Sequence, residues 1–203
     1  MKQILIAITC LILLGCVSQS PQHTSSTPNS IADARIALGL AYLKQGDTVK
    51  AKFNLDKAQR AAPTYIETDI ALSYYFIQVK EFAKADQRYQ QAIKRHPHHG
   101  GLLHNYATFL CQRHHYNKAQ HYFSLAIQQP DYPNIAASYE NSAICYWQNK
   151  QYQPALTMIE LAKNHSPQRS RIWQLHIQFL RAMGKPIEAN QLENQYRIMH
   201  NMN

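Results

Sequence analysis

The chain has 203 residues, a formal net charge of +9 and 45% hydrophobic residues. This length suits one domain or one short repeat array, and the hydrophobic content is ordinary for a folded soluble domain. The basic residues are dispersed along the sequence, so we interpret most of them as solvated helix faces and expect no nucleic-acid partner.

The N-terminal segment predicts export. Residues 1–15 combine Lys2 with an apolar run over residues 4–14. A helix that crosses a bilayer needs about 20 apolar residues, so this run is too short to span a membrane and fits a signal peptide instead. The run ends in Leu-Leu-Gly-Cys at Cys16 and resembles a bacterial lipoprotein signal. That resemblance implies lipidation of Cys16 and, with no Asp following it, an outer-membrane anchor facing the periplasm. The alternative is an ordinary signal peptide with an incidental cysteine.

Residues 16–31 form the next predicted segment. They are rich in Ser, Thr, Gln and Pro and cannot bury enough apolar surface to fold. We therefore predict a lipidated flexible tether with a reach of roughly 20 Å.

A period of about 34 residues organises the rest of the chain. Small residues recur at Ala51, Ala85, Ala119, Ala155 and Ala189, and a bulky residue follows four positions later at Leu55, Tyr89, Phe123 and Ile159. The pattern resembles the tetratricopeptide repeat (TPR), a helix–turn–helix unit. The resemblance implies an all-α, right-handed superhelix over residues 32–200. The expected units are residues 32–65, 66–99, 100–135, 136–169 and 170–200.

In such repeats the first helix of each unit lines a concave groove. The matching positions of the first two units form a contiguous apolar strip: Ile36, Leu40, Leu43, Ile70, Tyr74 and Ile77. Apolar side chains that are exposed and are not needed to pack one helix against another indicate a binding site for a partner. The alternative is that the tether or a neighbouring helix fills the strip. Farther along, the expected groove positions are polar: His104, Thr108, Glu140, Gln148, Arg171, Gln174, Gln178 and Arg181.

The sequence carries no recognisable catalytic pattern. Its 11 histidines include none in a helical His-x-x-x-His with a carboxylate partner, and there is no Cys-x-x-Cys, P-loop or dinucleotide fingerprint. We therefore expect no catalytic residue, no metal site, no small-molecule substrate and no cofactor beyond the lipid on Cys16. We also expect a monomer.

Cys111 and Cys145 occupy similar levels in the first helices of the third and fourth units. Those helices should be neighbours, and an oxidising periplasm permits a disulfide between them. The alternative is a pair of buried thiols.

Three stretches resemble the type IV pilus biogenesis/stability lipoproteins, the PilF/PilW pilotins. They are Asn105–Cys111, Pro130–Pro133 and Asn141–Cys145; Ala107 and Ala143 stand where that family more often has glycine. The resemblance implies a non-enzymatic outer-membrane pilotin that binds the pilus secretin in the groove of the first repeats. It also implies that the protein promotes secretin localisation and multimerisation and so supports pilus biogenesis. The alternative is a TPR lipoprotein adaptor for cell-wall enzymes or outer-membrane protein assembly.

Overall fold

The computed structural model describes residues 27–201, which form ten α-helices and no strand. This result confirms the predicted all-α class. The predicted signal peptide, Cys16 and most of the tether lie outside the described residues. Within the described part, none of the helices combines the length and the apolar character that crossing a membrane requires.

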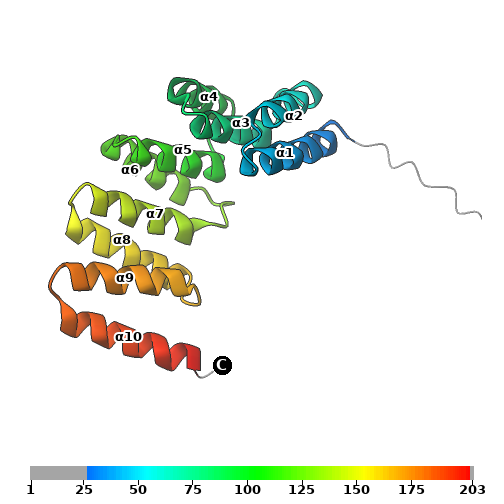
Figure 1. The fold of residues 1–203 in the computed structure, drawn as a ribbon. Coiled ribbons are helices and arrows are strands. Elements are labelled where there is room, and N and C mark those ends of the chain that lie inside the picture. Colours follow the sequence, from blue (N-terminus) through cyan, green and yellow to red (C-terminus); the bar gives the residue numbers. More distant parts are fainter. Residues whose placement is uncertain (1–26, 202–203) are drawn as a thin grey trace, which may run out of the picture.

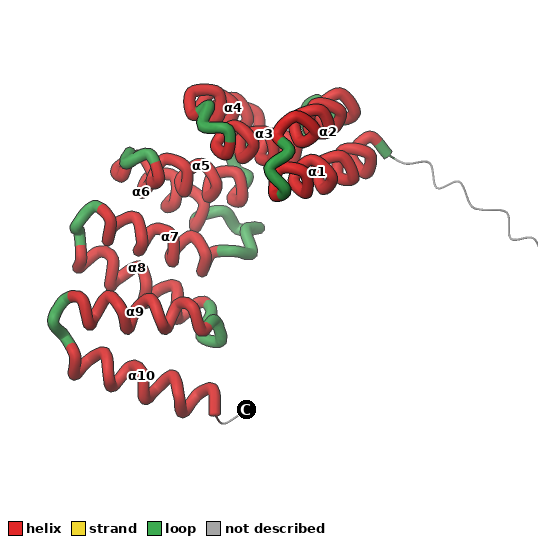
Figure 2. The backbone as a smooth tube through the Cα atoms, viewed as in Figure 1, coloured by secondary structure: helices red, strands yellow, loops and turns green. Residues whose placement is uncertain are grey.

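The helices pair into five antiparallel hairpins that stack into an arch (Figure 1). Short loops join the helices at both edges of the arch, as Figure 2 shows. The helices are α1 (Pro28–Lys44), α2 (Thr48–Ala61), α3 (Ile66–Gln78), α4 (Phe82–Arg95), α5 (Gly100–Gln112), α6 (Tyr116–Ile127), α7 (Ile135–Gln148), α8 (Tyr152–His165), α9 (Ser170–Ala182) and α10 (Pro186–Asn201).

Helix α1 begins earlier than the sequence predicted. The tether was expected to extend to residue 31, but residues 28–31 are helical. The Thr27 hydroxyl accepts a hydrogen bond from the Ser30 backbone N–H at 3.2 Å, and Pro28 has the fixed φ that suits a first helical position. A cap and a proline therefore start the helix before its apolar periodicity begins.

The repeating small residues form the contact line inside each hairpin. The five alanines of the predicted series are all fully buried, which lets the paired helices approach closely. The bulky residues of the second helices, Leu55, Tyr89, Phe123 and Ile159, are at most 3% exposed. Burial of such a side chain contributes about 1.5–3 kcal/mol. The core is thus a series of hydrophobic clusters distributed along the array.

Each hairpin turn places one residue in the left-handed backbone region. The φ angles are positive at Gly46, Lys80, His114, Lys150 and Gly184. Glycine adopts this conformation freely, whereas a residue with a side chain loses roughly 1–2 kcal/mol. This backbone conformation is kept at Lys80, His114 and Lys150 because the packing of the two helices of each hairpin fixes the turn between them.

The third unit carries a longer loop between α6 and α7. Tyr132 in this loop is only 7% exposed, because its ring lies over the start of α5. A Cβ atom added to Gly100 would lie 2.5–2.8 Å from the Tyr132 side chain. Gly100 therefore provides the space into which the longer loop inserts its aromatic ring.

Candidate functional site

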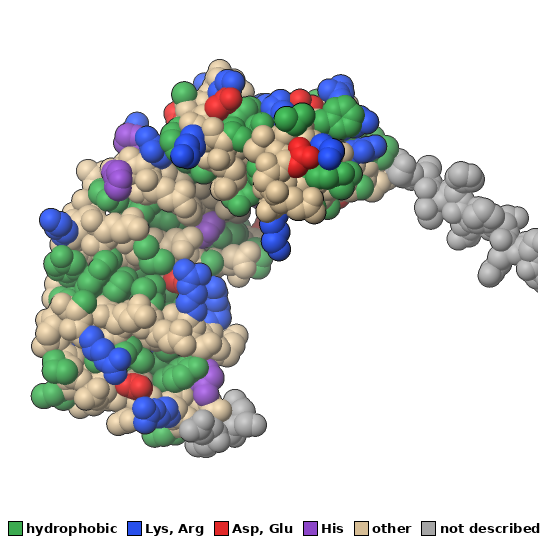
Figure 3. Space-filling view, viewed as in Figure 1, with side chains coloured by type: hydrophobic (Ala, Val, Ile, Leu, Met, Phe, Trp, Pro, Cys, Tyr) green, Lys and Arg blue, Asp and Glu red, His purple; other side chains and the backbone are tan. Residues whose placement is uncertain are grey.

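A groove of about 560 Å³ lies between α1 and α3 in the first two repeats. Five of the six predicted groove residues line it: Ile36, Leu40, Leu43, Ile70 and Tyr74. The inner side of the arch is visibly hollow in the space-filling view (Figure 3). This volume falls in the range of specific binding pockets, roughly 300–1,000 Å³.

A close approach of two helices sets the position of α1. An added Cβ at Gly39 would lie 2.9 Å from Leu55 and 3.2 Å from the Ala51 carbonyl oxygen. Any larger residue would require the Leu55 side chain or the helices themselves to shift. With Gly39 against α2, the adjacent face of α1 presents Ile36 and Leu40 toward α3 and the groove.

A buried carboxylate sets the position of α3. Asp69 is 2% exposed and accepts hydrogen bonds from Arg88 at 2.9 Å and Arg95 at 2.5 Å. Arg88 also donates to Gln59 of α2 at 3.2 Å. A buried charge is tolerated only when it is paired in this way, so the rotation of α3 is fixed. Ile70, the next residue along the chain, thereby faces the groove.

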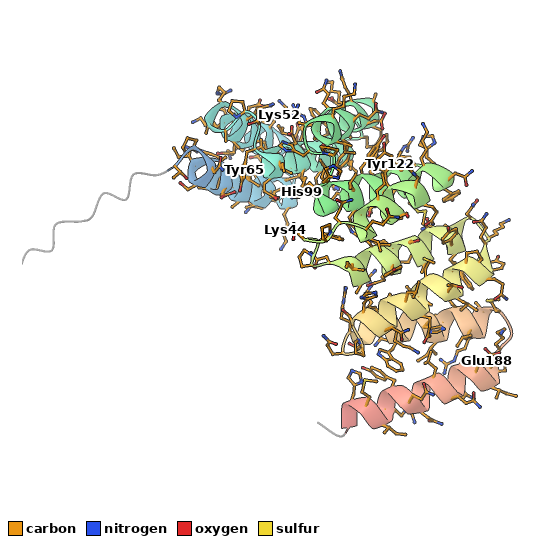
Figure 4. All side chains as sticks on the ribbon, turned by 180° about the vertical axis from the view of Figure 1, so that it is seen from behind. Lys44, Lys52, Tyr65, His99, Tyr122 and Glu188 are labelled. Carbon is orange, nitrogen blue, oxygen red and sulfur yellow. A yellow bond between two sulfur atoms is a disulfide. The ribbon has the colours of Figure 1, made fainter. Side chains whose placement is uncertain are left out.

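The sequence missed several residues of the groove: Lys44, Glu67, Ala71, Gln78, Tyr89 and Asn105. Figure 4 shows Lys44 projecting from the last turn of α1 into the hollow of the arch. Lys44 and Glu67 give the opening one charge of each sign. Burial raises the pKa of the Tyr89 phenol, so this side chain is neutral. Tyr89 and Asn105 belong to α4 and α5, and a rule based on the first helices of two repeats does not reach them.

Ile77 is the one predicted groove residue that the structure does not place in the lining of the groove. It packs, partly buried, against the core cluster that contains Tyr106 and Phe109 of α5. The next hairpin therefore covers this position. The groove itself continues along α3 as far as Gln78.

The polar positions of the later repeats are largely occupied by internal bonds. Glu140 was expected to line the groove but is only 2% exposed. It forms ion pairs with Arg169 at 3.3 Å and Arg171 at 3.0 Å, so two arginines at the start of α9 neutralise it. These bonds leave less free polar surface than the sequence predicted.

His104 belongs to the same internally bonded region. Its Nδ1 atom lies 2.8 Å from the Ser138 hydroxyl, and the Asn141 amide donates to its Nε2 atom at 3.3 Å. Burial lowers the pKa of His104 to about 4. The ring is therefore neutral near pH 7 and serves as a bridge between α5 and α7.

The clustered histidines have local roles. His99 accepts a hydrogen bond from the Leu102 backbone N–H at 3.1 Å and so caps α5. His96 lies 3.2 Å from the Thr64 carbonyl oxygen, and His114 lies 2.7 Å from the Tyr116 hydroxyl. Among residues 27–201, no group of three or more His, Cys, Asp or Glu side chains is arranged to hold a metal ion.

Cys111 of α5 and Cys145 of α7 are brought together across the boundary between the third and fourth repeats. Their Cα atoms are 5.8 Å apart, and the structure pairs them as a disulfide. This separation is typical of disulfide bonds.

Comparisons with known proteins agree with the repeat architecture. Tetratricopeptide-repeat family patterns match residues 32–65 and 69–99. An uncharacterized protein of Haemophilus influenzae is 35% identical over 144 residues, which are 71% of this chain and 79% of that protein.

Two comparisons point to one protein of Pseudomonas aeruginosa. The type IV pilus assembly protein PilF is 32% identical over 149 residues, covering 72% of this chain and 59% of PilF. The match thus spans less than two thirds of PilF. A solved structure of P. aeruginosa PilF superimposes with a TM-score of 0.72 at 26% identity, covering 83% of this chain and 76% of that chain. The chain therefore belongs to one family of tetratricopeptide-repeat proteins with the Haemophilus influenzae protein, and it is similar in sequence and in fold to PilF, a type IV pilus assembly protein.

Proposed function

We propose that this protein is an outer-membrane pilotin. It binds the secretin of a type IV pilus system, and its lipid anchor carries the secretin to the outer membrane, where multimers assemble. The similarity to PilF in sequence and fold supports a role in the pilus machinery, and the repeat fold supports a protein-binding role without catalysis. The observation that carries the proposal is the open apolar groove of the first two repeats.

The groove favours a short apolar segment of the secretin as its occupant. Leu40 and Ile70 line the groove from two adjacent helices, and an amphipathic segment bound in such a groove uses a few apolar anchors. Lys44 and Glu67, one positive and one negative, line the same groove. They favour a segment with complementary charges beside its apolar anchors, because charges of fixed sign set the orientation of a bound segment.

The substitution Leu40→Asp tests the groove. A carboxylate placed among apolar side chains should prevent binding, so we expect secretin multimers to disappear from a gel of cell extracts. Ile187→Asp is the matched control, because Ile187 is 73% exposed at the far end of the array. Normal multimers in the Leu40→Asp strain, with the folded protein present, would contradict the groove assignment.

The substitution Cys16→Ala tests the anchor separately. We expect the fold and the groove to be intact and the secretin to be displaced from the outer-membrane fraction. Membrane fractionation with secretin immunoblotting measures this effect. Correct outer-membrane secretin in that strain would exclude a mechanistic role for the lipid.

A further inference from the structure

We propose that one face of the first hairpin docks on an anionic phospholipid surface. This N-terminal face is the side of α1 and α2 that no other hairpin covers. It consists of apolar Ile31, Leu38, Tyr42, Val49 and Phe53 and of basic Arg35, Lys50 and Lys57. The inference rests on the lipid anchor of the proposed function, and it adds the orientation of the repeat array relative to the membrane.

Helical spacing places these residues together. Ile31, Leu38 and Tyr42 recur at intervals of seven and four along α1, and Val49 and Phe53 lie four apart on α2. Ala32 and Gly39 of α1 are buried against α2, and Leu40 faces α3. The Lys50 ammonium lies 5.3 Å from the Tyr42 ring centroid and connects the two helices. The face is therefore contiguous and distinct from the groove.

The N-terminal face is unusually apolar for the end of a repeat array. Val49 is 79% exposed, Phe53 55%, Leu38 41% and Ile31 40%. Terminal repeats normally need a polar outer surface for solubility. Apolar side chains retained on such a surface indicate that something covers them in the working protein.

The charge around the apolar residues favours lipid head groups. Residues 28–61 carry six Lys or Arg and three Asp residues, and Figure 3 shows basic and apolar side chains interleaved over α1 and α2. The Lys57 ammonium lies 4.3 Å from the Phe53 ring centroid. Lysine stems lie along apolar surface while their ammonium groups reach the phosphates, and basic residues beside a membrane bind anionic lipids.

The position of the predicted lipid selects the bilayer over other occupants. Thr27, at the start of α1, is eleven residues after Cys16, and eleven residues span at most about 38 Å. Ile31 lies in the first turn of that helix. An anchored chain therefore holds the N-terminal face near the head groups at high effective concentration, so that a weak surface is sufficient for docking.

Lysine acetylation measures the docking. The full-length protein, purified with its lipid, is reconstituted in vesicles of phosphatidylethanolamine and phosphatidylglycerol and treated with an acetylating reagent. Mass spectrometry then compares Lys50 and Lys57 with the distant Lys118 and Lys150. We expect at least about five-fold slower acetylation of Lys50 and Lys57 in anionic vesicles than in phosphatidylcholine vesicles, with loss of this protection at high salt.

Paired variants provide the control. Val49→Glu with Phe53→Glu should abolish the protection, and Ile187→Glu with Ile198→Glu, equally exposed positions on α10, should leave it unchanged. Thermal melting by circular dichroism verifies that both variants fold.

Three results would overturn the docking. In the first, the protein floats with anionic vesicles, but Lys50 and Lys57 are acetylated as fast as Lys150. This result would contradict the docking and would leave the proposed lipid anchor unaffected. Protection that appears in neutral vesicles and rises with protein density would assign the face to a second copy of the chain. A protein that does not float with the vesicles would overturn the anchor and the docking together. Secretin multimers in cells report on the groove independently.

Discussion

The first two repeats and the next two use the same hairpin but treat the inner face of their first helices differently. In the first two, Leu40 and Tyr74 border an open groove, and Tyr74 is 47% exposed. In the third and fourth, His104 bonds to Ser138, and Cys111 pairs with Cys145. The inner face of the first helices thus serves recognition where it stays open and stability where neighbouring side chains close it.

The largest expected effect is on the closed region. Phe123 in α6 is 1% exposed, and Phe123→Ala should lower the free energy of unfolding by about 3–5 kcal/mol, since it leaves a cavity in a packed core. Urea denaturation of purified protein measures the change. A loss below about 1 kcal/mol would show that Phe123 contributes no more to stability than an exposed side chain does.

Removing the disulfide should have the next largest effect. The bond between Cys111 and Cys145 closes a loop with a sequence separation of 34, so reduction should cost about 3–4 kcal/mol through greater freedom of the unfolded chain. Denaturation with and without dithiothreitol measures the loss. The Cys111→Ala, Cys145→Ala double variant is the control and should not respond to the reductant. Equal stability of the native chain in both conditions would mean that the bond is not formed.

The fold was largely predictable because its signal is periodic. The alanines of the 34-residue series mark the helix contacts, and all of them are buried. The groove was only partly predictable. Ile77 occupies an equivalent repeat position but is covered by a helix of the next unit, and Glu140 is neutralised by arginines that follow in the chain. A position within a repeat specifies a face, whereas coverage of that face depends on neighbouring units.

The bridge formed by His104 predicts a pH dependence. The folded-state pKa, about 4, is below the ordinary value of 6.5 because of burial, so the unfolded chain takes up the proton first. The stabilisation is complete above about pH 6.5 and is lost as the pH falls toward 4. We expect a loss of about 2 kcal/mol over that range from this group.

Denaturation of the wild type and of His104→Gln, compared at pH 7.5 and 4.5, measures that loss. The variant should be less stable at pH 7.5 and should lose less stability on acidification. Burial also lowers the pKa of His176, so some acid sensitivity will persist in the variant. An identical pH response of both proteins would contradict the assignment.

The smallest effect is expected in the open groove. Tyr74→Ala should change the free energy of unfolding by no more than about 0.5 kcal/mol, because its side chain is half exposed. Leu72→Ala, two residues away and 1% exposed, is the control and should cost about 2–5 kcal/mol. Thermal unfolding compares the two variants. Similar losses in both would show that the groove contributes to the core.

The ring of Tyr132 over Gly100 has a consequence for how this family varies. The position of the Tyr132 ring requires glycine at residue 100, since a Cβ atom there would clash with the Tyr132 side chain. Relatives with the longer loop and an aromatic residue at its tip should keep glycine at the start of the facing helix. Relatives with a shorter loop should be free to hold larger residues there. Sequence divergence is therefore expected to proceed by coupled change at these two places.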